Sequence, residues 1–446
     1  MLIFSVILLF VYLFFCKQIK DPLLKKILYF LVILYGTQIC MAIWDPYQVY
    51  KVSFITVVLF NIQIMCLIMG VNLCKRTKTV RNISRSNFSW PSIEINKLLL
   101  VVVTIFFLYS YYNYNRMQSF LIYMANTSDE GREYYFTMFF PTYTLRVIDM
   151  FITSFKYVAF IISITLLFKN GIRLKIKEIY FIALTILAYI LQLLTSQSRT
   201  ETFVVLFMLI LMAFVSSIYD AKTYKKRVLP FMIFAVIGIG AVFLSVTLLR
   251  ANLKSDGFDE SLIDELILQP FSTYFYVPIL AFDYTRNTLL NFGFPLFGCA
   301  TFSAVVDTIL LPLTYLDHGF GAYTMNTVLG NTIGTGMYFP SGKHWMAMFT
   351  GCANYYLDFW YLGFIIFPLL HGWVLAKLVY TFRTKASSFI LLSFMFYASF
   401  RHATASGIQS VDTVFFLFWV YLACKSKAVS YYNVLSHNSI ILDKHQ

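Results

Sequence analysis

The sequence predicts an all-α polytopic membrane protein with about eleven transmembrane helices. Hydrophobic residues make up 59% of the 446 residues, charged residues only 13%, and the mean hydropathy is +0.71. Nearly uncharged windows, long enough to cross a bilayer as helices, recur along the chain. Basic residues are concentrated between alternate windows, as expected of cytoplasmic loops.

The first window, "MLIFSVILLFVYLFFC", has the length of a signal peptide but not its flanks. It has no basic segment before it and no small-residue cleavage site, and its lysines follow it at Lys17 and Lys20. We therefore expect a retained first span with an external N-terminus. The expected spans are 1–16, 27–44, 54–74, 98–112, 147–168, 179–194, 203–219, 228–249, 361–380, 387–405 and 413–424.

The distribution of charge tests this topology. Counting Lys377 with the loop beside it, the predicted cytoplasmic pieces hold 24 of the 35 Lys and Arg residues. Sixteen of the 21 acidic residues lie outside or near the outer surface. The net charge of +14 is therefore explained by the positive-inside rule, and no motif supports binding to nucleic acid. The cytoplasmic pieces are 17–26, 75–97, 169–178, 220–227, 381–386 and the tail after 424.

This topology divides the chain into four parts. Residues 1–249 hold the first eight spans, 250–360 form a large external loop, 361–424 hold the last three spans, and 425–446 form a cytoplasmic tail. Within the loop, 292–316 is apolar, but Gly, Pro and Asp residues interrupt it, and one more crossing would place basic segments outside. We expect a re-entrant or interfacial segment there.

The external loop is rich in aromatic residues and carboxylates, as in "PFSTYFYVPILAFDYTRN". Aromatic faces stack on sugar rings and carboxylates accept hydrogen bonds from hydroxyl groups. Asp283, Tyr284 and Arg286 are therefore candidates for contact with a glycan, with Asp283 also a candidate base. An aromatic belt at the membrane interface is the alternative interpretation.

The stretch "TSQSRTETF" raises a second question. Ser198 and Glu201 form a capping-box pattern for a helix start, which leaves Arg199 in the first turn, where the helix dipole disfavours a cation. A bound anion would resolve this conflict, because arginine pairs with phosphate bidentately and a helix N-terminus supplies free N–H groups. Arg250 ends the next span, so both guanidinium groups are predicted to face one outer pocket and bind a lipid pyrophosphate.

Three more residues are candidates at the same level. Arg401 and His402, in "ASFRHATASG", end the tenth span, and His344 lies in the external "PSGKHW". Arg401 is a candidate ligand of the anion, and each histidine could activate an acceptor hydroxyl group, although a lone histidine is more often structural.

Several kinds of chemistry lack support in the sequence. There is no Gly-rich nucleotide loop, no H-E-x-x-H and no G-x-S-x-G, and the seven cysteines lack metal-ligand spacing. We therefore expect neither a metal nor another cofactor.

These features together resemble the Wzy-type O-antigen and capsule repeat-unit polymerases. The resemblance lies in "SQSRTET" at the start of a mid-chain span, "LLRANLKSD" leaving the next, a long outer loop, and the late "NYYLDFWYLGFIIFPLLHGW". The last is similar to a "Y-x-D-F-G-x-x-G" stretch before a closing span, with Trp360 where glycine is commoner.

The resemblance implies a GT-C-like glycosyltransferase of the bacterial cytoplasmic membrane. It would transfer a growing glycan from undecaprenyl pyrophosphate to another lipid-linked repeat unit at the outer face, without metal or nucleotide. Arg199 and Arg250 would bind the donor pyrophosphate, and a histidine or outer carboxylate would act as the base. Membrane lipid, a chain-length regulator and a flippase would be its partners.

Three alternatives differ in their expected features. An O-antigen ligase shares the topology and the arginines and differs in its acceptor. A lipid-linked oligosaccharide flippase should carry charged residues along several spans, whereas here Asp149 and Lys156 are the main examples. A sugar O-acyltransferase should have an early catalytic histidine, and the first histidine here is His318.

Overall fold

In the computed structural model about 84% of the described residues are helical, which agrees with the predicted all-α class. It describes residues 1–76, 90–124, 143–171, 173–196, 199–234, 237–238, 240–241, 275–289, 294–316, 337–338, 344–345, 351–404 and 412–430. Within these ranges the long helices are α1 (Leu2–Lys17), α2 (Pro22–Trp44), α3 (Phe54–Arg76), α4 (Lys97–Met124), α6 (Tyr143–Asn170), α7 (Ile176–Ser196), α8 (Arg199–Tyr219), α17 (Gly363–Thr381), α18 (Ala386–Thr404) and α19 (Asp412–Lys425).

Six helical stretches in the described part of the chain are long and apolar enough to cross a membrane. They fall on predicted spans, and α1 and α8 are shorter apolar helices on two others. The protein is therefore a helical membrane protein, while the total of eleven spans stays a prediction. The six stretches are Pro22–Trp44, Phe54–Cys74, Lys97–Gln118, Val147–Asn170, Ile176–Thr195 and Cys352–Thr381.

Helix ends follow local chemistry. Before α2, the Asp21 carboxylate accepts hydrogen bonds from the N–H groups of Leu23 and Leu24, both at 2.9 Å, and Pro22 occupies the first turn. At the other extreme, α4 continues to Met124, well past the predicted end at 112. The polar residues after 112 lower the hydropathy but include neither Gly nor Pro, so the helix continues.

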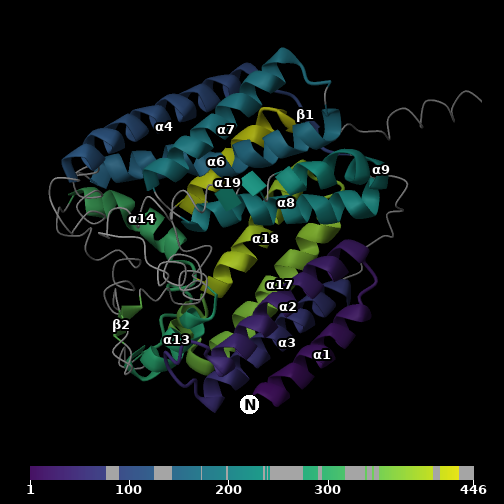
Figure 1. Ribbon diagram of the computed structural model, residues 1–446, viewed down its shortest axis with the longest axis vertical. Helices are drawn as coiled ribbons and strands as arrows, with labels where there is room; N and C mark the ends of the chain where they lie inside the picture. Colours follow the sequence, from purple (N-terminus) through teal and green to yellow (C-terminus); the bar gives the residue numbers. More distant parts are fainter. Residues whose placement is uncertain are drawn as a thin grey trace, which may run out of the picture.

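The helices form two groups (Figure 1). Helices α1, α2, α3 and α17 pack together, as do α4, α6, α7 and α19, and α8 and α18 lie between them. Glycines bring α3 and α17 into backbone contact: a Cβ atom on Gly70 would lie 2.1 Å from the Leu369 oxygen, and one on Gly372 would lie 2.1 Å from the Leu67 oxygen. Small residues at helix crossings are typical of membrane bundles.

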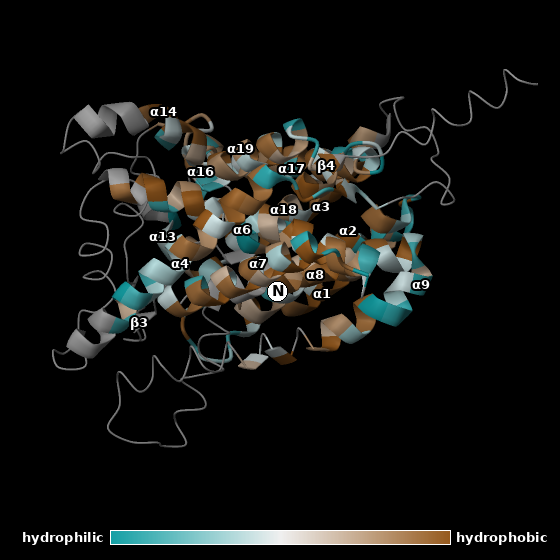
Figure 2. Ribbon diagram, turned by 90° about the horizontal axis from the view of Figure 1, so that it is seen from above, coloured by the Kyte–Doolittle hydropathy of each residue, from teal (hydrophilic) through white to brown (hydrophobic). Residues whose placement is uncertain are grey.

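One end of the bundle joins all six segments predicted to be cytoplasmic. Arg383 donates to Asp21 at 3.1 Å, Trp90 donates to Asp220 at 3.3 Å, and Lys169 donates to the Pro91 oxygen at 3.4 Å. Arg227, in the short π-helix Tyr224–Val228, donates to the oxygens of Phe168 and Lys169, and β1 (Ser92–Ile93) pairs antiparallel with β4 (Val429–Ser430). Arg383 also donates to the hydroxyl group of Tyr219, next to the 220–227 segment, which connects the two sets of contacts. Figure 2 shows hydrophilic residues around α9 (Ala221–Thr223) at this end.

The opposite end carries the described parts of the predicted external loop. These are α13 (Val277–Leu289), α14 (Ser303–Leu316), α16 (Cys352–Phe359) and the strand pair β2 (Met337–Tyr338) and β3 (His344–Trp345). Helix α14 has 14 residues, or about 21 Å at 1.5 Å per residue, less than the roughly 30 Å of a bilayer core. The re-entrant or interfacial segment predicted for 292–316 stays a prediction.

Candidate functional site

Helix α16 organises this end of the molecule. Its residues from Cys352 to Asp358 are buried, and adjacent tyrosines face different neighbours. The Tyr355 ring stacks on Phe367 and on His402, both with ring centroids 4.7 Å apart, whereas the Tyr356 ring meets Phe282 of α13 edge-on at 5.6 Å. Helix α16 therefore separates two groups of candidate residues, one around His402 and one on α13.

The Asp358 carboxylate fixes the apolar part of the external loop onto α16. It is fully buried and accepts hydrogen bonds from the N–H groups of Ala300 at 2.9 Å and Thr301 at 2.7 Å. The N–H group of Leu296 donates to the Leu357 oxygen at 3.0 Å, which extends the same attachment. Asp358 therefore acts as an anchor, because its oxygens satisfy backbone donors.

Two positions in the turn after α16 constrain the backbone. Trp360 has φ 49° and ψ −131°, a conformation that glycine adopts far more readily than other residues. Three residues later, a Cβ atom on Gly363 would lie 1.9 Å from the Tyr355 oxygen. Packing therefore requires a glycine at position 363, and Trp360 adopts its conformation at a backbone cost.

His402 is buried at the end of α18 and is held on several sides. Its Nε2 lies 3.5 Å from the Cys352 thiol, which forms no disulfide and donates to Gln63 at 2.9 Å. A Cβ atom on Gly351 would lie 2.0 Å from Nδ1, so this nitrogen packs against the Gly351 backbone. Both nitrogens of the predicted catalytic His402 thus face protein atoms.

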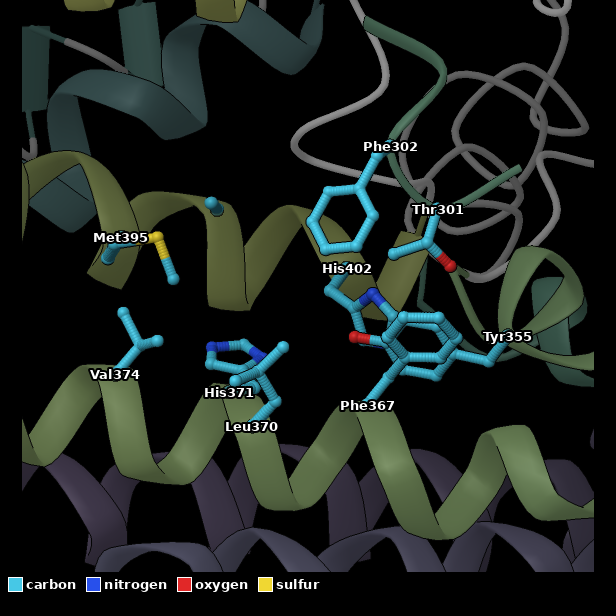
Figure 3. Close-up of a pocket in the computed structure, with 10 residues that line it drawn as sticks. Thr301, Phe302, Tyr355, Phe367, Leu370, His371, Val374, Met395 and His402 are labelled. Carbon is cyan, nitrogen blue, oxygen red and sulfur yellow. The ribbon is translucent and has the colours of Figure 1, made fainter. Parts of the chain in front are cut away.

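A second histidine, which the sequence analysis did not single out, lies nearby. His371 on α17 has its ring centroid 6.3 Å from that of His402, and its Nε2 lies 2.7 Å from the Ser399 hydroxyl. Both imidazoles line one cavity of about 200 Å³ between α17 and α18 (Figure 3). The sequence contained a signal that could have identified His371, because an ionisable residue inside an apolar span is by itself a functional candidate.

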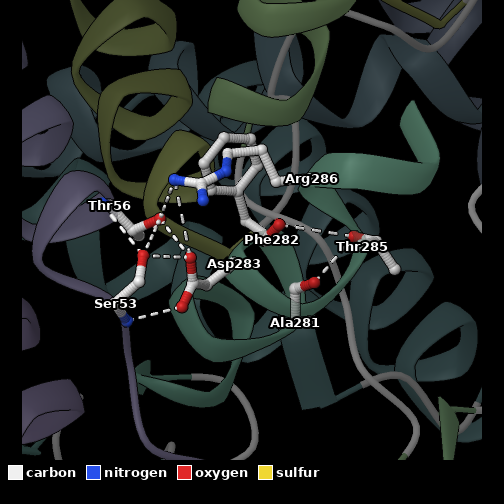
Figure 4. Close-up of polar contacts among 7 residues, drawn as sticks. All are labelled: Ser53, Thr56, Ala281, Phe282, Asp283, Thr285 and Arg286. Carbon is white, nitrogen blue, oxygen red and sulfur yellow. Dashed lines mark hydrogen bonds and ion pairs between the residues drawn. The ribbon is translucent and has the colours of Figure 1, made fainter. Parts of the chain in front are cut away.

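On the other side of α16, Asp283 is buried against the start of α3 (Figure 4). Its carboxylate accepts from the Ser53 N–H and hydroxyl groups, both at 2.6 Å, and from the Thr56 hydroxyl at 2.5 Å. This is a helix N-terminal cap supplied by a residue distant in sequence. A role for Asp283 as the base would require it to release these donors.

Arg286 and Tyr284 complete the group on α13. The Nη1 atom of Arg286 lies 3.8 Å from Asp283 and 3.4 Å from the Thr56 hydroxyl, while its buried Nε finds no hydrogen-bond partner among the described residues. Tyr284 is 40% exposed and meets the Tyr50 ring edge-on at 5.6 Å. Burial, and then the Asp283 carboxylate, raises the pKa of Tyr50, and Arg286 opposes the rise. The three predicted α13 residues are thus brought together, with Tyr284 available to a ligand.

The predicted arginines of the spans are described in part. Helix α8 is described from Arg199 onward, the predicted cap Ser198 lies outside the described residues, and the half-buried Arg401 lies in the last turn of α18. Phe207 of α8 stacks on Phe400 of α18 with ring centroids 3.7 Å apart, so the two helix ends that carry Arg199 and Arg401 lie at the same end of the bundle. Arg250 and the side chains of Arg199 and His344 lie outside the described residues; His344 begins β3.

The described residues contain no group of three or more His, Cys, Asp and Glu side chains that could hold a metal ion. Comparison with known proteins gives no family for this chain: no family model, no curated protein and no solved structure matches it.

Proposed function

We propose that the protein polymerises lipid-linked oligosaccharide repeat units at the outer face of the bacterial cytoplasmic membrane. It would transfer the glycan from undecaprenyl pyrophosphate to another lipid-linked repeat unit during synthesis of O-antigen, capsule or exopolysaccharide. The proposal includes an eleven-span, GT-C-like arrangement with its working face outside, and a reaction that uses no metal or other cofactor.

The observation that carries this proposal is the position of the first turn of α8. This helix begins at Arg199 and packs beside α18, whose last turn holds Arg401 and His402, through the Phe207–Phe400 stack. A cation in the first turn of a helix is unfavourable unless an anion is bound there. A pyrophosphate bound by Arg199, Arg250 and Arg401 would supply that anion and gain stabilisation as its negative charge grows.

The chemistry needs a proton acceptor for the attacking hydroxyl group. That hydroxyl forms the new glycosidic bond, the bond from the donor sugar to pyrophosphate breaks, and the proton passes to a base. His402 would first have to leave the Cys352 thiol, and Asp283 would have to release Ser53 and Thr56. His344 is the third candidate. Tyr284 and Arg286 would contact the glycan beyond the bond that reacts.

An O-antigen ligase and a flippase are the competing proposals. The ligase would use the same arginines on a different acceptor. If the protein is a flippase, charged groups are expected along its spans. Within the described residues Asp149 accepts a hydrogen bond from Tyr109 at 2.9 Å, and the Lys156 ammonium lies 5.0 Å from the centre of the Tyr157 ring.

The surface glycan of a deletion strain separates these activities. A polymerase defect leaves single repeat units on the glycan anchor, a ligase defect leaves the anchor without glycan, and a flippase defect leaves lipid-linked units inside. Purified protein in liposomes with lipid-linked repeat units should then form polymer in the presence of a metal chelator. Normal polymer length in the deletion strain would disprove the proposal.

A further inference from the structure

The cavity of about 200 Å³ between α17 and α18 has the composition of a binding site for an uncharged ligand. Helix α17 runs along one side of it and α18 along the other, and the turn at Thr301 and Phe302 covers one end (Figure 3). The ten described residues that line it include no Asp, Glu, Lys or Arg. A charged ligand would lose its hydration there without gaining an opposite charge, so the site selects a neutral one.

The cavity also offers a few polar atoms. Ser399 donates its hydroxyl proton to the Met395 oxygen at 2.7 Å, so its oxygen accepts from Nε2–H of His371 at 2.7 Å. In the neutral imidazole, Nδ1 of His371 is then the unprotonated nitrogen, which accepts a hydrogen bond. Figure 3 shows the Tyr355 ring reaching the cavity with its hydroxyl oxygen foremost.

Thr301 lines the cavity without offering it a polar atom. Figure 3 shows its hydroxyl oxygen directed away from the cavity. His371 therefore supplies the hydrogen-bond acceptor on which the following argument rests.

The cavity opens toward a part of the protein surface that is covered by apolar side chains. Phe302 and Leu370 line the cavity and are also 42% and 43% exposed. Val305 and Ile366, each about one helical turn from these residues, are 49% and 42% exposed. Exposed apolar side chains on a spanning helix face lipid tails, so a molecule can enter this cavity from the bilayer.

We propose that the cavity binds an alcohol from the bilayer: an apolar molecule or chain end with one hydroxyl group. The hydroxyl group donates to Nδ1 of His371, and the apolar part packs against Phe302, Phe367 and Val374. An engineered apolar cavity of about 150 Å³ holds benzene, so this one admits roughly eight non-hydrogen atoms by the same ratio. The inference does not depend on glycan chemistry.

Two probes of that size, para-cresol and toluene, differ in the hydroxyl group alone. We expect the purified full-length protein to be photolabelled in α17 or α18 by 3-azibutanol, a diazirine alcohol that is small enough for the cavity. We expect para-cresol to compete roughly three- to tenfold better than toluene, the value of one hydrogen bond. Equal competition by the two probes, or labelling spread evenly over the helices, would overturn the proposal.

Variants sharpen this test. Ala398→Leu fills the cavity and should abolish the competed labelling, whereas Ala423→Leu, the same change at a buried α19 position outside the cavity, should leave it unchanged. His371→Leu should abolish the preference for para-cresol over toluene. Retained labelling in a folded Ala398→Leu protein would contradict the site. The source of the alcohol is found by extracting the purified proteins. An alcohol that copurifies with the wild type but not with Ala398→Leu would identify a membrane lipid as the ligand. If para-cresol binds but no alcohol copurifies, the ligand is a small free alcohol.

Discussion

The Cys352 thiol lies 3.5 Å from Nε2 of His402, although the two residues are 50 positions apart in the chain. The contact joins the first residue of α16 to the last turn of α18. The N–H group of Gly351 adds a hydrogen bond to the His402 oxygen at 3.0 Å. The imidazole therefore forms a fixed wall between the cavity and the buried face of α16.

Gly351→Ala should disturb this junction, because the added methyl group would lie 2.0 Å from Nδ1 of His402. We expect a loss of about 1–3 kcal/mol in the free energy of unfolding, as for other overpacked sites. Thermal unfolding in detergent measures it. Gly238→Ala is the matched control, since no atom of the described residues lies within 4 Å of its new methyl group. Equal melting temperatures for both variants would contradict this packing.

Asp358→Ala should detach the segment 294–302 from α16. The substitution leaves the N–H groups of Ala300 and Thr301 buried without acceptors, and each unpaired donor costs about 1–3 kcal/mol. Limited proteolysis should cleave this segment faster than in the wild type. The exposed Glu94 provides a control, because Glu94→Ala should change stability by no more than about 0.5 kcal/mol. Unchanged cleavage would show that Asp358 is not the anchor.

Substitutions of Trp360 can isolate the backbone strain at φ 49°. Trp360→Gly and Trp360→Val remove the same indole, so the difference in their stabilities reports the backbone. Glycine adopts this conformation freely and a β-branched residue does not, so the glycine variant should be more stable by about 1–3 kcal/mol. A valine variant that melts at the same temperature or higher would rule out the strain.

Asp220 should make stability depend on pH at the basic end. Burial alone would raise its pKa, but hydrogen bonds from Thr223 and Trp90 and the nearby Arg227 outweigh burial and hold the pKa below its ordinary value. The stabilisation is then complete above the unfolded pKa, about 3.9, and is lost as the pH falls through the lower folded value.

Comparison with Asp220→Asn tests this sign. Asparagine keeps an acceptor for the Thr223 N–H group but does not titrate, so the advantage of the wild type at pH 7 should shrink at low pH. Melting temperatures between pH 7 and pH 3 measure the difference. An advantage that stays constant over this range would contradict the lowered pKa.

Arg199 carries the prediction for activity. Arg199→Ala should reduce polymer formation about a hundred- to a thousandfold, the effect of losing one donor to a charged transition state. Arg199→Lys should retain part of the activity, because it keeps the charge and loses the bidentate geometry. Polymer assays are normalised to protein in the membrane, with Arg116→Ala as an arginine control elsewhere in the outer half. Normal activity in a well-expressed Arg199→Ala protein would exclude Arg199 from the site.

The sequence by itself determined the helical membrane class and most helix positions. It also determined that the basic segments lie together at one end of the bundle. Uninterrupted apolar windows and clustered lysines are local properties, so they can be read without knowing what packs against what.

Only the tertiary structure decided which residues share a site. The bonds from Ser53 to Asp283 span 230 positions, and no local pattern predicts such a cap. His371 was hidden for a related reason. In a membrane, lipid tails and protein core are equally apolar, so the sequence of α17 does not reveal which of its faces packs against α18. Helix packing then decides that His371 faces a cavity and that Asp283 is held against α3.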